Sequence, residues 1–245
     1  MMHSSFRLLT LAASLLASVL LARCAFAQEE IAPPQGKGHV VVFVSGILGP
    51  KHDKALSEAI AALGYDVYVC DGRQIAKMAG GNLRAAIEAA QKMPHALPGK
   101  VALVGISLGG GLALALGSEW PDVVAVDIVW YPATGFAARL PGFARRMSVP
   151  VLMFAGEADH FENCCLIETA RAIETTAKAN NAPFELVTYP GTDHDFIKGG
   201  RNYNPTAYED ALNRTAAKLK AAFADQNGTS TGEGQNFRQA DQQSF

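Results

Sequence analysis

One serine of the chain lies in a context that could activate its hydroxyl for nucleophilic attack. Ser107 stands between Gly105 and Gly109, where the apolar run 101–106 meets an Ala/Leu-rich stretch of helical spacing. A Gly-x-Ser-x-Gly turn between a buried strand and a helix holds its serine on a strained backbone, and only small neighbours leave room for it. Phosphate-binding loops require Gly-x-Gly-x-x-Gly or a terminal Gly-Lys-Ser/Thr, and this segment has neither. We therefore interpret Ser107 as a nucleophile.

A serine nucleophile needs a base and an acid, and candidates for both follow later strands. Asp159 comes after the apolar run 151–154, and His194 follows the run 184–189. The carboxyl ends of parallel strands meet at one edge of a sheet, so all three side chains are expected there. Their order along the chain, Ser then Asp then His, is that of α/β-hydrolases. In this scheme His194 takes the Ser107 proton, and Asp159 fixes the imidazole tautomer.

Other residues compete for the roles of base and acid. His160 is a second histidine, but it follows the acid strand directly and would have to swing over the serine. The competing acids are Glu157 and the two aspartates that flank His194, namely Asp193 and Asp195. The side chains of those flanking aspartates are expected to point away from the imidazole.

Two backbone amides are candidates to stabilise a developing oxyanion. The amide of Leu108 follows the nucleophile at the start of a helix, where N–H groups have no acceptor within the helix. The second amide is expected from the loop after the strand 40–44. Gly46 permits close backbone approach there, and Ile47 is the expected donor. An ordinary strand-to-helix turn is the alternative interpretation of this loop.

The elements that must position these residues alternate along the chain. Apolar, β-branched runs predict strands, and the segments between them have helical spacing. Asn82 is a candidate N-cap and Gly64 a candidate helix stop. The alternation predicts an α/β fold, a mostly parallel doubly wound sheet flanked by helices. The expected strands are 40–44, 67–70, 101–106, 123–129, 151–154 and 184–189, and the expected helices are 54–63, 83–93, 108–117, 162–180 and 206–223.

The chain is interpreted as a leader, one domain and a tail. Residues 1–27 have the pattern of a signal peptide, with Arg7 before an apolar stretch that is shorter than the roughly 20 residues of a membrane span. Ala25-Phe26-Ala27 is the expected cleavage site, which predicts a secreted or periplasmic protein. A lipoprotein anchor at Cys24 is less favoured, because Arg23 precedes it where a small residue is usual.

Residues 28–224 form the expected hydrolase domain, and the Gln/Gly/Ser/Thr-rich residues 225–245 an expected disordered tail. With a net charge of −2 and no cluster of basic residues, the sequence does not predict a surface that binds nucleic acid. No His/Cys/Asp cluster has the spacing of metal ligands, so neither a metal nor an organic cofactor is expected.

From residue 101 to residue 196 the chain resembles the dienelactone hydrolase family of small α/β-hydrolases. The resemblance rests on Gly105-Ile106-Ser107-Leu108-Gly109-Gly110, on Pro150 through Asp159, and on Tyr189-Pro190-Gly191-Thr192-Asp193-His194-Asp195-Phe196. It implies an α/β-hydrolase fold without a large lid and hydrolysis of small-molecule esters or lactones. It also implies a basic residue after the histidine that holds a substrate carboxylate, matched here by Lys198 or Arg201.

The chain departs from the family pattern at two positions. Dienelactone-opening members typically use a cysteine nucleophile, where this chain has Ser107, and a glutamate in the first-strand loop, where it has Gly46. These differences favour a serine esterase or lactonase over a true dienelactone hydrolase. A non-catalytic binding protein of the same fold, and a peptidase or acyltransferase with the same triad, are the alternatives.

Three cysteines follow the expected cleavage site: Cys70, Cys164 and Cys165. In the strand order of the family, Cys70 would lie about four strand spacings, ~19 Å, from the other two. A disulfide rarely joins Cα atoms more than ~7 Å apart, so no bridge to Cys70 is expected. The adjacent pair could form a vicinal disulfide or stay reduced.

Overall fold

The computed structural model describes residues 29–77, 81–135 and 142–232 of the chain. The predicted signal peptide lies outside the described residues, as does the end of the predicted tail. Among the described helices, none combines the length and the apolar character that crossing a membrane would require.

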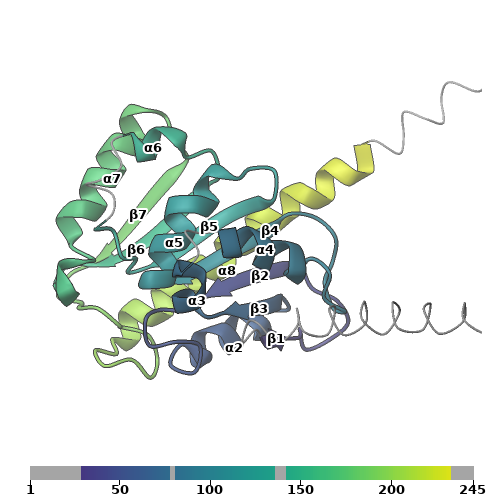
Figure 1. Cartoon of the computed structure of the whole chain (residues 1–245), viewed down its shortest axis with the longest axis horizontal. Helices are drawn as coiled ribbons and strands as arrows, with labels where there is room; N and C mark the ends of the chain where they lie inside the picture. Colours follow the sequence, from purple (N-terminus) through teal and green to yellow (C-terminus); the bar gives the residue numbers. More distant parts are fainter. Residues whose placement is uncertain (1–28, 78–80, 136–141, 233–245) are drawn as a thin grey trace, which may run out of the picture.

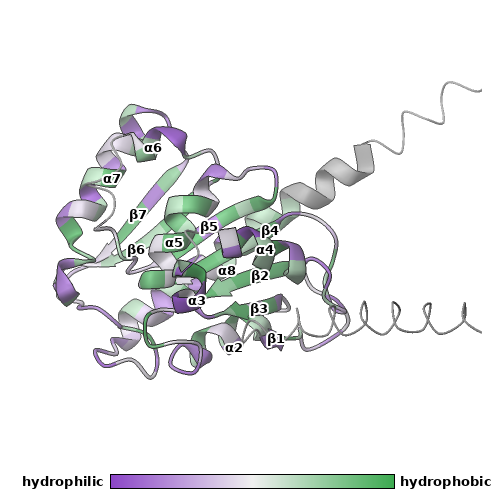
Figure 2. Cartoon of the chain, in the orientation of Figure 1, coloured by the Kyte–Doolittle hydropathy of each residue, from purple (hydrophilic) through white to green (hydrophobic). Residues whose placement is uncertain are grey.

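The described residues build a 7-stranded sheet in the order β1-β3-β2-β4-β5-β6-β7. Only β1 is antiparallel to its neighbour. The predicted mostly parallel sheet is therefore confirmed, and the strands in its middle are apolar on both faces because helices cover both (Figure 2). The strands are β1 (Glu29–Ile31), β2 (Val40–Val44), β3 (Asp66–Cys70), β4 (Val101–Ile106), β5 (Val124–Trp130), β6 (Val151–Gly156) and β7 (Phe184–Tyr189).

Helices pack on the two faces of this sheet and enclose two apolar cores. One face is covered by α2 (Lys54–Ala62) and α8 (Pro205–Gly232), and α8 crosses the strands as the long diagonal of Figure 1. No large lid covers the carboxyl edge of the sheet in the described part of the chain. The other face is covered by α3 (Gly72–Ala76), α4 (Gly81–Ala90), α5 (Leu108–Leu116), α6 (Phe143–Arg146) and α7 (Ile167–Ala179).

Several predicted boundaries are wrong. Asn82 is not an N-cap but lies inside α4, where its amide donates to the carbonyl of Gln74. Helix α8 continues to Gly232, well into the segment predicted to be disordered. Short β1, α3 and α6 were not predicted at all. Gly64 does follow the end of α2, with the positive φ of +99° that stops a helix.

The predicted helix 162–180 starts later than expected, because α7 begins only at Ile167. Before it come a short 3-10 helix, η3 (Phe161–Asn163), and then Cys164 and Cys165. Glu162 and Asn163 have φ values of +49° and +51°, in the left-handed region, which interrupts a right-handed helix.

Candidate active site

Ser107 occupies a sharp turn between β4 and α5. Its φ of 49° and ψ of −114° lie outside the regions that an L-residue prefers. A Cβ on Gly105 would lie 2.7 Å from the carbonyl oxygen of Gly109, and a Cβ on Gly109 would lie 2.1 Å from that of Val44. The turn can therefore form only with glycine at both positions, as the sequence predicted. It raises Ser107 above the carboxyl edge of the sheet.

The structure brings the three predicted side chains together at this edge. Nε2 of His194 lies 3.0 Å from Oγ of Ser107, and Nδ1 lies 2.7 Å from Oδ2 of Asp159. All three are buried, with exposed fractions of 6% or less. A carboxylate can only accept hydrogen bonds, so Nδ1–H donates to Asp159 and leaves Nε2 to accept from the Ser107 hydroxyl. This arrangement can deprotonate the serine as its oxygen attacks an electrophile.

The loop after β6 holds the acid from a second side. The backbone N–H of Phe161 donates to Oδ1 of Asp159 at 3.0 Å, so both carboxylate oxygens are bonded. The ring of Phe161 stacks on the His194 imidazole, with centroids 4.5 Å apart and planes 8° from parallel. Phe161 was not among the predicted site residues, since its position depends on the irregular turn before α7.

The other titratable residues named as competitors make different contacts. Glu157 bonds to Arg171 and Thr188, and Asp195 bonds to His52. Asp193 accepts the backbone N–H of His194 rather than a ring hydrogen. His160 lines the cavity beside the site but makes no hydrogen bond to Ser107 in the described structure.

Of the two predicted oxyanion donors, Leu108 directly follows Ser107 in the chain and Ile47 lines the same cavity as Ser107. Leu108 is the first residue of α5, so its amide has no acceptor within the helix. Ile47 lies in the loop after β2 and lines the cavity. The preceding Gly46 amide donates to Oδ2 of Asp53 at 2.7 Å, which fixes this loop.

Sequence reasoning did not identify Asp53 as a site residue, because a position directly before a helix suggests only an N-cap. In the structure its side chain makes no capping hydrogen bond. The Asp53 side chain is 1% exposed, and burial raises its pKa to about 6. The hydrogen bond from Gly46 and the nearby His52 oppose that shift. The loop after β2 is therefore held by a carboxyl group with a raised pKa.

Tyr131 was also not predicted. It follows β5 with a φ of 35°, and its ring packs edge-on against His194 with centroids 4.8 Å apart. Its hydroxyl is buried without a hydrogen-bond partner in the described structure, and burial raises its pKa well above the ordinary value. The buried ring therefore limits the movement of the imidazole on that side.

A cavity of about 610 Å³ opens in front of Ser107. Ile47, Leu48 and Phe161 form apolar parts of its wall and are 47%, 62% and 41% exposed. Arg201 lines the cavity, as a substrate-binding residue should, and its guanidinium has no ion-pair partner among the described residues. Lys198 does not line it, so that the structure brings only one of the two predicted basic residues to the site.

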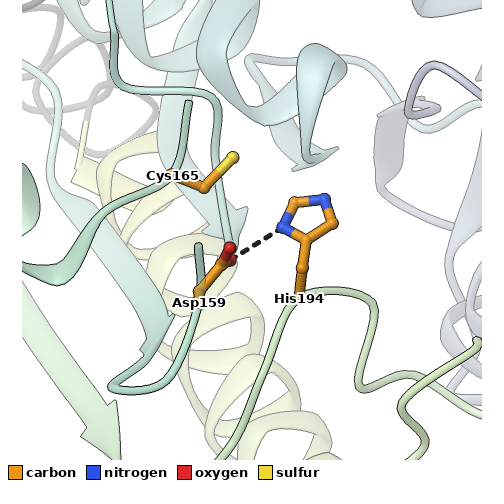
Figure 3. Close-up of side chains that lie close together, drawn as sticks. All are labelled: Asp159, Cys165 and His194. Carbon is orange, nitrogen blue, oxygen red and sulfur yellow. Dashed lines mark hydrogen bonds and ion pairs between the residues drawn. The ribbon is translucent and has the colours of Figure 1, made fainter. Parts of the chain in front are cut away.

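Cys164 and Cys165 form a disulfide, and Cys70 is a buried free thiol whose pKa burial raises to about 12. The expectation of no bridge to Cys70 is met. Figure 3 shows Cys165 beside Asp159 and His194, with the bond between the last two dashed. Ligand-type atoms of these three residues lie within 4.8 Å of one another, but the sulfur is held in the disulfide.

Comparison with known proteins points to one family. The model of the dienelactone hydrolase family matches residues 72–223. A curated protein of Aquifex aeolicus (strain VF5), "Putative carboxymethylenebutenolidase", is 25% identical over 143 residues, which cover 56% of this chain. The chain spans 59% of the length of this curated relative.

Solved structures share the fold at low sequence identity. The "Putative Dienelactone Hydrolase" of Klebsiella pneumoniae subsp. pneumoniae MGH 78578 is 18% identical, with a TM-score of 0.66, and the match covers 79% of this chain and 92% of that one. Thermogutta terrifontis esterase 2, phosphorylated by paraoxon, is 20% identical with a TM-score of 0.58, and the match covers 77% and 85% of the two chains. At these identities the likeness supports the fold alone.

Proposed function

The chain belongs to the dienelactone hydrolase family, and on this premise we propose that it is a serine hydrolase of small carboxylic esters or lactones. The observation that carries the proposal is the continuous contact from Ser107 through His194 to Asp159, at 3.0 and 2.7 Å. Ser107 is the proposed nucleophile, His194 the base and Asp159 the acid. The amides of Leu108 and Ile47 are the proposed oxyanion donors.

In this mechanism Ser107 Oγ attacks the substrate carbonyl carbon while its proton passes to Nε2 of His194. The carbonyl oxygen becomes an oxyanion that faces the two amides. His194 then gives the proton to the departing alkoxide, which leaves an acyl group on Ser107. Water attacks this ester in the second half of the cycle and gives a proton to His194, which passes it to Ser107 Oγ as the bond to the acyl group breaks and the carboxylic acid is released.

The cavity suits compact substrates. Its wall is apolar at Ile47, Leu48 and Phe161, and Arg201 offers a positive charge at its border. We propose that Arg201 binds a carboxylate on the substrate, a role for which the position of Lys198 gives no support. The segment Ala25-Phe26-Ala27 supports the further proposal that the mature enzyme acts in the periplasm or outside the cell.

The function is tested by covalent labelling and turnover. Paraoxon, which phosphorylates the esterase of Thermogutta terrifontis, and a fluorophosphonate probe should label the wild type, and p-nitrophenyl acetate should be hydrolysed. Ser107→Ala should abolish labelling and turnover. Ser118→Ala, which removes another buried hydroxyl beyond the far end of α5, should keep both. Folded wild-type protein that is neither labelled nor active would refute the proposal and favour a non-catalytic binding protein.

A further inference from the structure

Three potential metal ligands meet at the edge of the sheet opposite to Ser107. Glu30 lies on β1, Asp66 is the first residue of β3, and His95 lies in the turn after α4. Glu30 pairs with Tyr68, two residues beyond Asp66, so both acidic side chains leave the same face of the sheet. The turn is pinned beside them, because the Gly38 amide donates to the His95 carbonyl at 2.9 Å. Three separate segments therefore present these side chains to one point.

Asp66 is the unusual member of this group. Its side chain is buried, at 2% exposure for the residue, and among the described residues no N–H or O–H group donates to either carboxylate oxygen. A buried carboxylate normally has donors or a cation beside it. Asp53, Asp71 and Asp159, which are also buried near strand ends, each accept a backbone N–H. Asp127, inside β5, is the other buried carboxylate without a donor among the described residues.

The spacing of the three groups fits a small cation. One oxygen from each acid and one nitrogen of His95 all lie within 4.8 Å of one another, and Nδ1 of His95 is 2.9 Å from Oε1 of Glu30. Ligands that lie about 2.0–2.2 Å from a tetrahedral Zn²⁺ are separated by roughly 3.3 Å, so small side-chain adjustments suffice. An imidazole in the set favours zinc-like ions over Mg²⁺ or Ca²⁺, which prefer oxygen alone.

We propose that Glu30, Asp66 and His95 bind a divalent transition-metal ion of the zinc type, with water as the fourth ligand. The two carboxylates balance its charge, and His95 binds through Nδ1 after losing the proton shared with Glu30. The ion joins β1, which has only three residues and lies at the sheet edge, to β3 and to the turn after α4. Its role is structural, since the triad lies at the other ends of the strands.

The second ligand-like cluster, Asp159, Cys165 and His194, is a poorer metal site. Its sulfur belongs to the Cys164–Cys165 disulfide, and Asp159 and His194, which bond to each other (Figure 3), are also bonded to the Phe161 amide and to Ser107. Binding there would also block the proposed base, so an ion at this position would reveal itself by inhibition.

The test is a zinc titration of the purified chain after EDTA treatment and desalting. Calorimetry should show one Zn²⁺ per chain, and Zn²⁺ at about 100 times its Kd should raise Tm by roughly 5–10 °C. Glu30→Gln and His95→Gln should lose both effects. Glu29→Gln removes a neighbouring exposed carboxylate of the same strand and should keep them.

Asp66→Asn separates loss of binding from loss of folding. It removes a buried charge, so the metal-free variant should be at least as stable as the wild type while failing to respond to Zn²⁺. Absence of any Tm shift in the wild type would overturn the proposal. So would a shift that persists in Glu30→Gln and His95→Gln, because the ion would then lie elsewhere, for example at His194.

Discussion

At the scale of single residues, two aspartates contact His194 in different ways. Asp159 bonds to the ring at Nδ1, whereas Asp193 bonds only to the backbone amide. If Asp159 fixes the tautomer, Asp159→Asn should lower kcat for p-nitrophenyl acetate by about four orders of magnitude without unfolding the protein. Asp193→Asn keeps an acceptor for the amide and should change kcat only slightly. Comparable losses in the two variants would remove the reason to assign Asp159 as the acid.

Asp53 is expected to act through the loop that it anchors. Asp53→Ala deletes the acceptor of the Gly46 amide, and we expect it to displace the Ile47 amide and to reduce kcat roughly 10- to 100-fold. Asp53→Asn offers an oxygen in nearly the same place and should retain most of the activity. Both variants are measured at saturating p-nitrophenyl acetate, with circular dichroism to verify folding. Equal activity in the Ala variant and the wild type would show that the loop needs no anchor.

The residues that sequence reasoning found and those that it missed differ in what determines their position. Ser107, Asp159 and His194 each follow a strand, and the topology of a parallel sheet is enough to bring such positions to one edge. Asp53, Tyr131 and Phe161 reach the site through turns whose shape depends on tertiary packing. No periodicity or motif marks such residues, so only coordinates assign them a contact.

At the scale of elements, the turn between β6 and α7 carries the acid and much of the environment of the base. Cys164 accepts hydrogen bonds at its carbonyl from the amides of Thr134 and Gly135, which ties the turn to the segment after β5. The apolar residues after residue 162 do have helical spacing. The helix nevertheless begins only at Ile167, because Glu162 and Asn163 have left-handed backbone angles and the Cys164–Cys165 disulfide follows them. Local backbone geometry in residues 162–165, together with the hydrogen bonds from Thr134 and Gly135, overrides helix propensity here.

This turn places the Phe161 ring over His194, and the contact can be tested alone. Phe161→Ala should lower kcat/KM for p-nitrophenyl acetate roughly 2- to 10-fold, the range that a stacked aromatic pair contributes. Phe161→Tyr keeps the ring, and its hydroxyl can reach water because Phe161 is 41% exposed. The Tyr variant should therefore match the wild type. If Ala and Tyr are equally impaired, the stacking contact is not what supports the site.

At the scale of the whole molecule, the sheet could be predicted because its central strands are continuous apolar runs. The three-residue β1 could not, since Glu29–Ile31 contains two glutamates and has no strand-like alternation. It pairs with β3, which lies far away in the sequence, and this pairing brings Glu30 close to Asp66 and His95. The same limit explains why the spacing of residues in the sequence gave no indication of this cluster.

The molecule also buries a carboxyl group in the sheet itself, and this predicts how its stability depends on pH. Asp127 on β5 is fully buried, neither of its oxygens has a hydrogen-bond partner among the described residues, and burial raises its pKa well above the ordinary value. The folded protein therefore keeps the proton that the unfolded chain releases. The stability from this group is complete below the unfolded pKa, near 4, and falls by about 1.4 kcal/mol per pH unit above it, until the pH reaches the folded pKa.

Asp53 and Asp66 act with the same sign, but each has a pKa of about 6, so their contribution to the slope ends near neutral pH. Above about pH 7, and up to the folded pKa of Asp127, the slope from Asp127 should remain alone among the three. Urea unfolding in EDTA should show the wild type losing stability across this window relative to Asp127→Asn, whose side chain stays neutral. Asp122→Asn, at an exposed ion pair with Arg84, should keep the wild-type slope, because that group is ionised in both states. Parallel curves for wild type and Asp127→Asn would mean that Asp127 is already ionised in the folded protein.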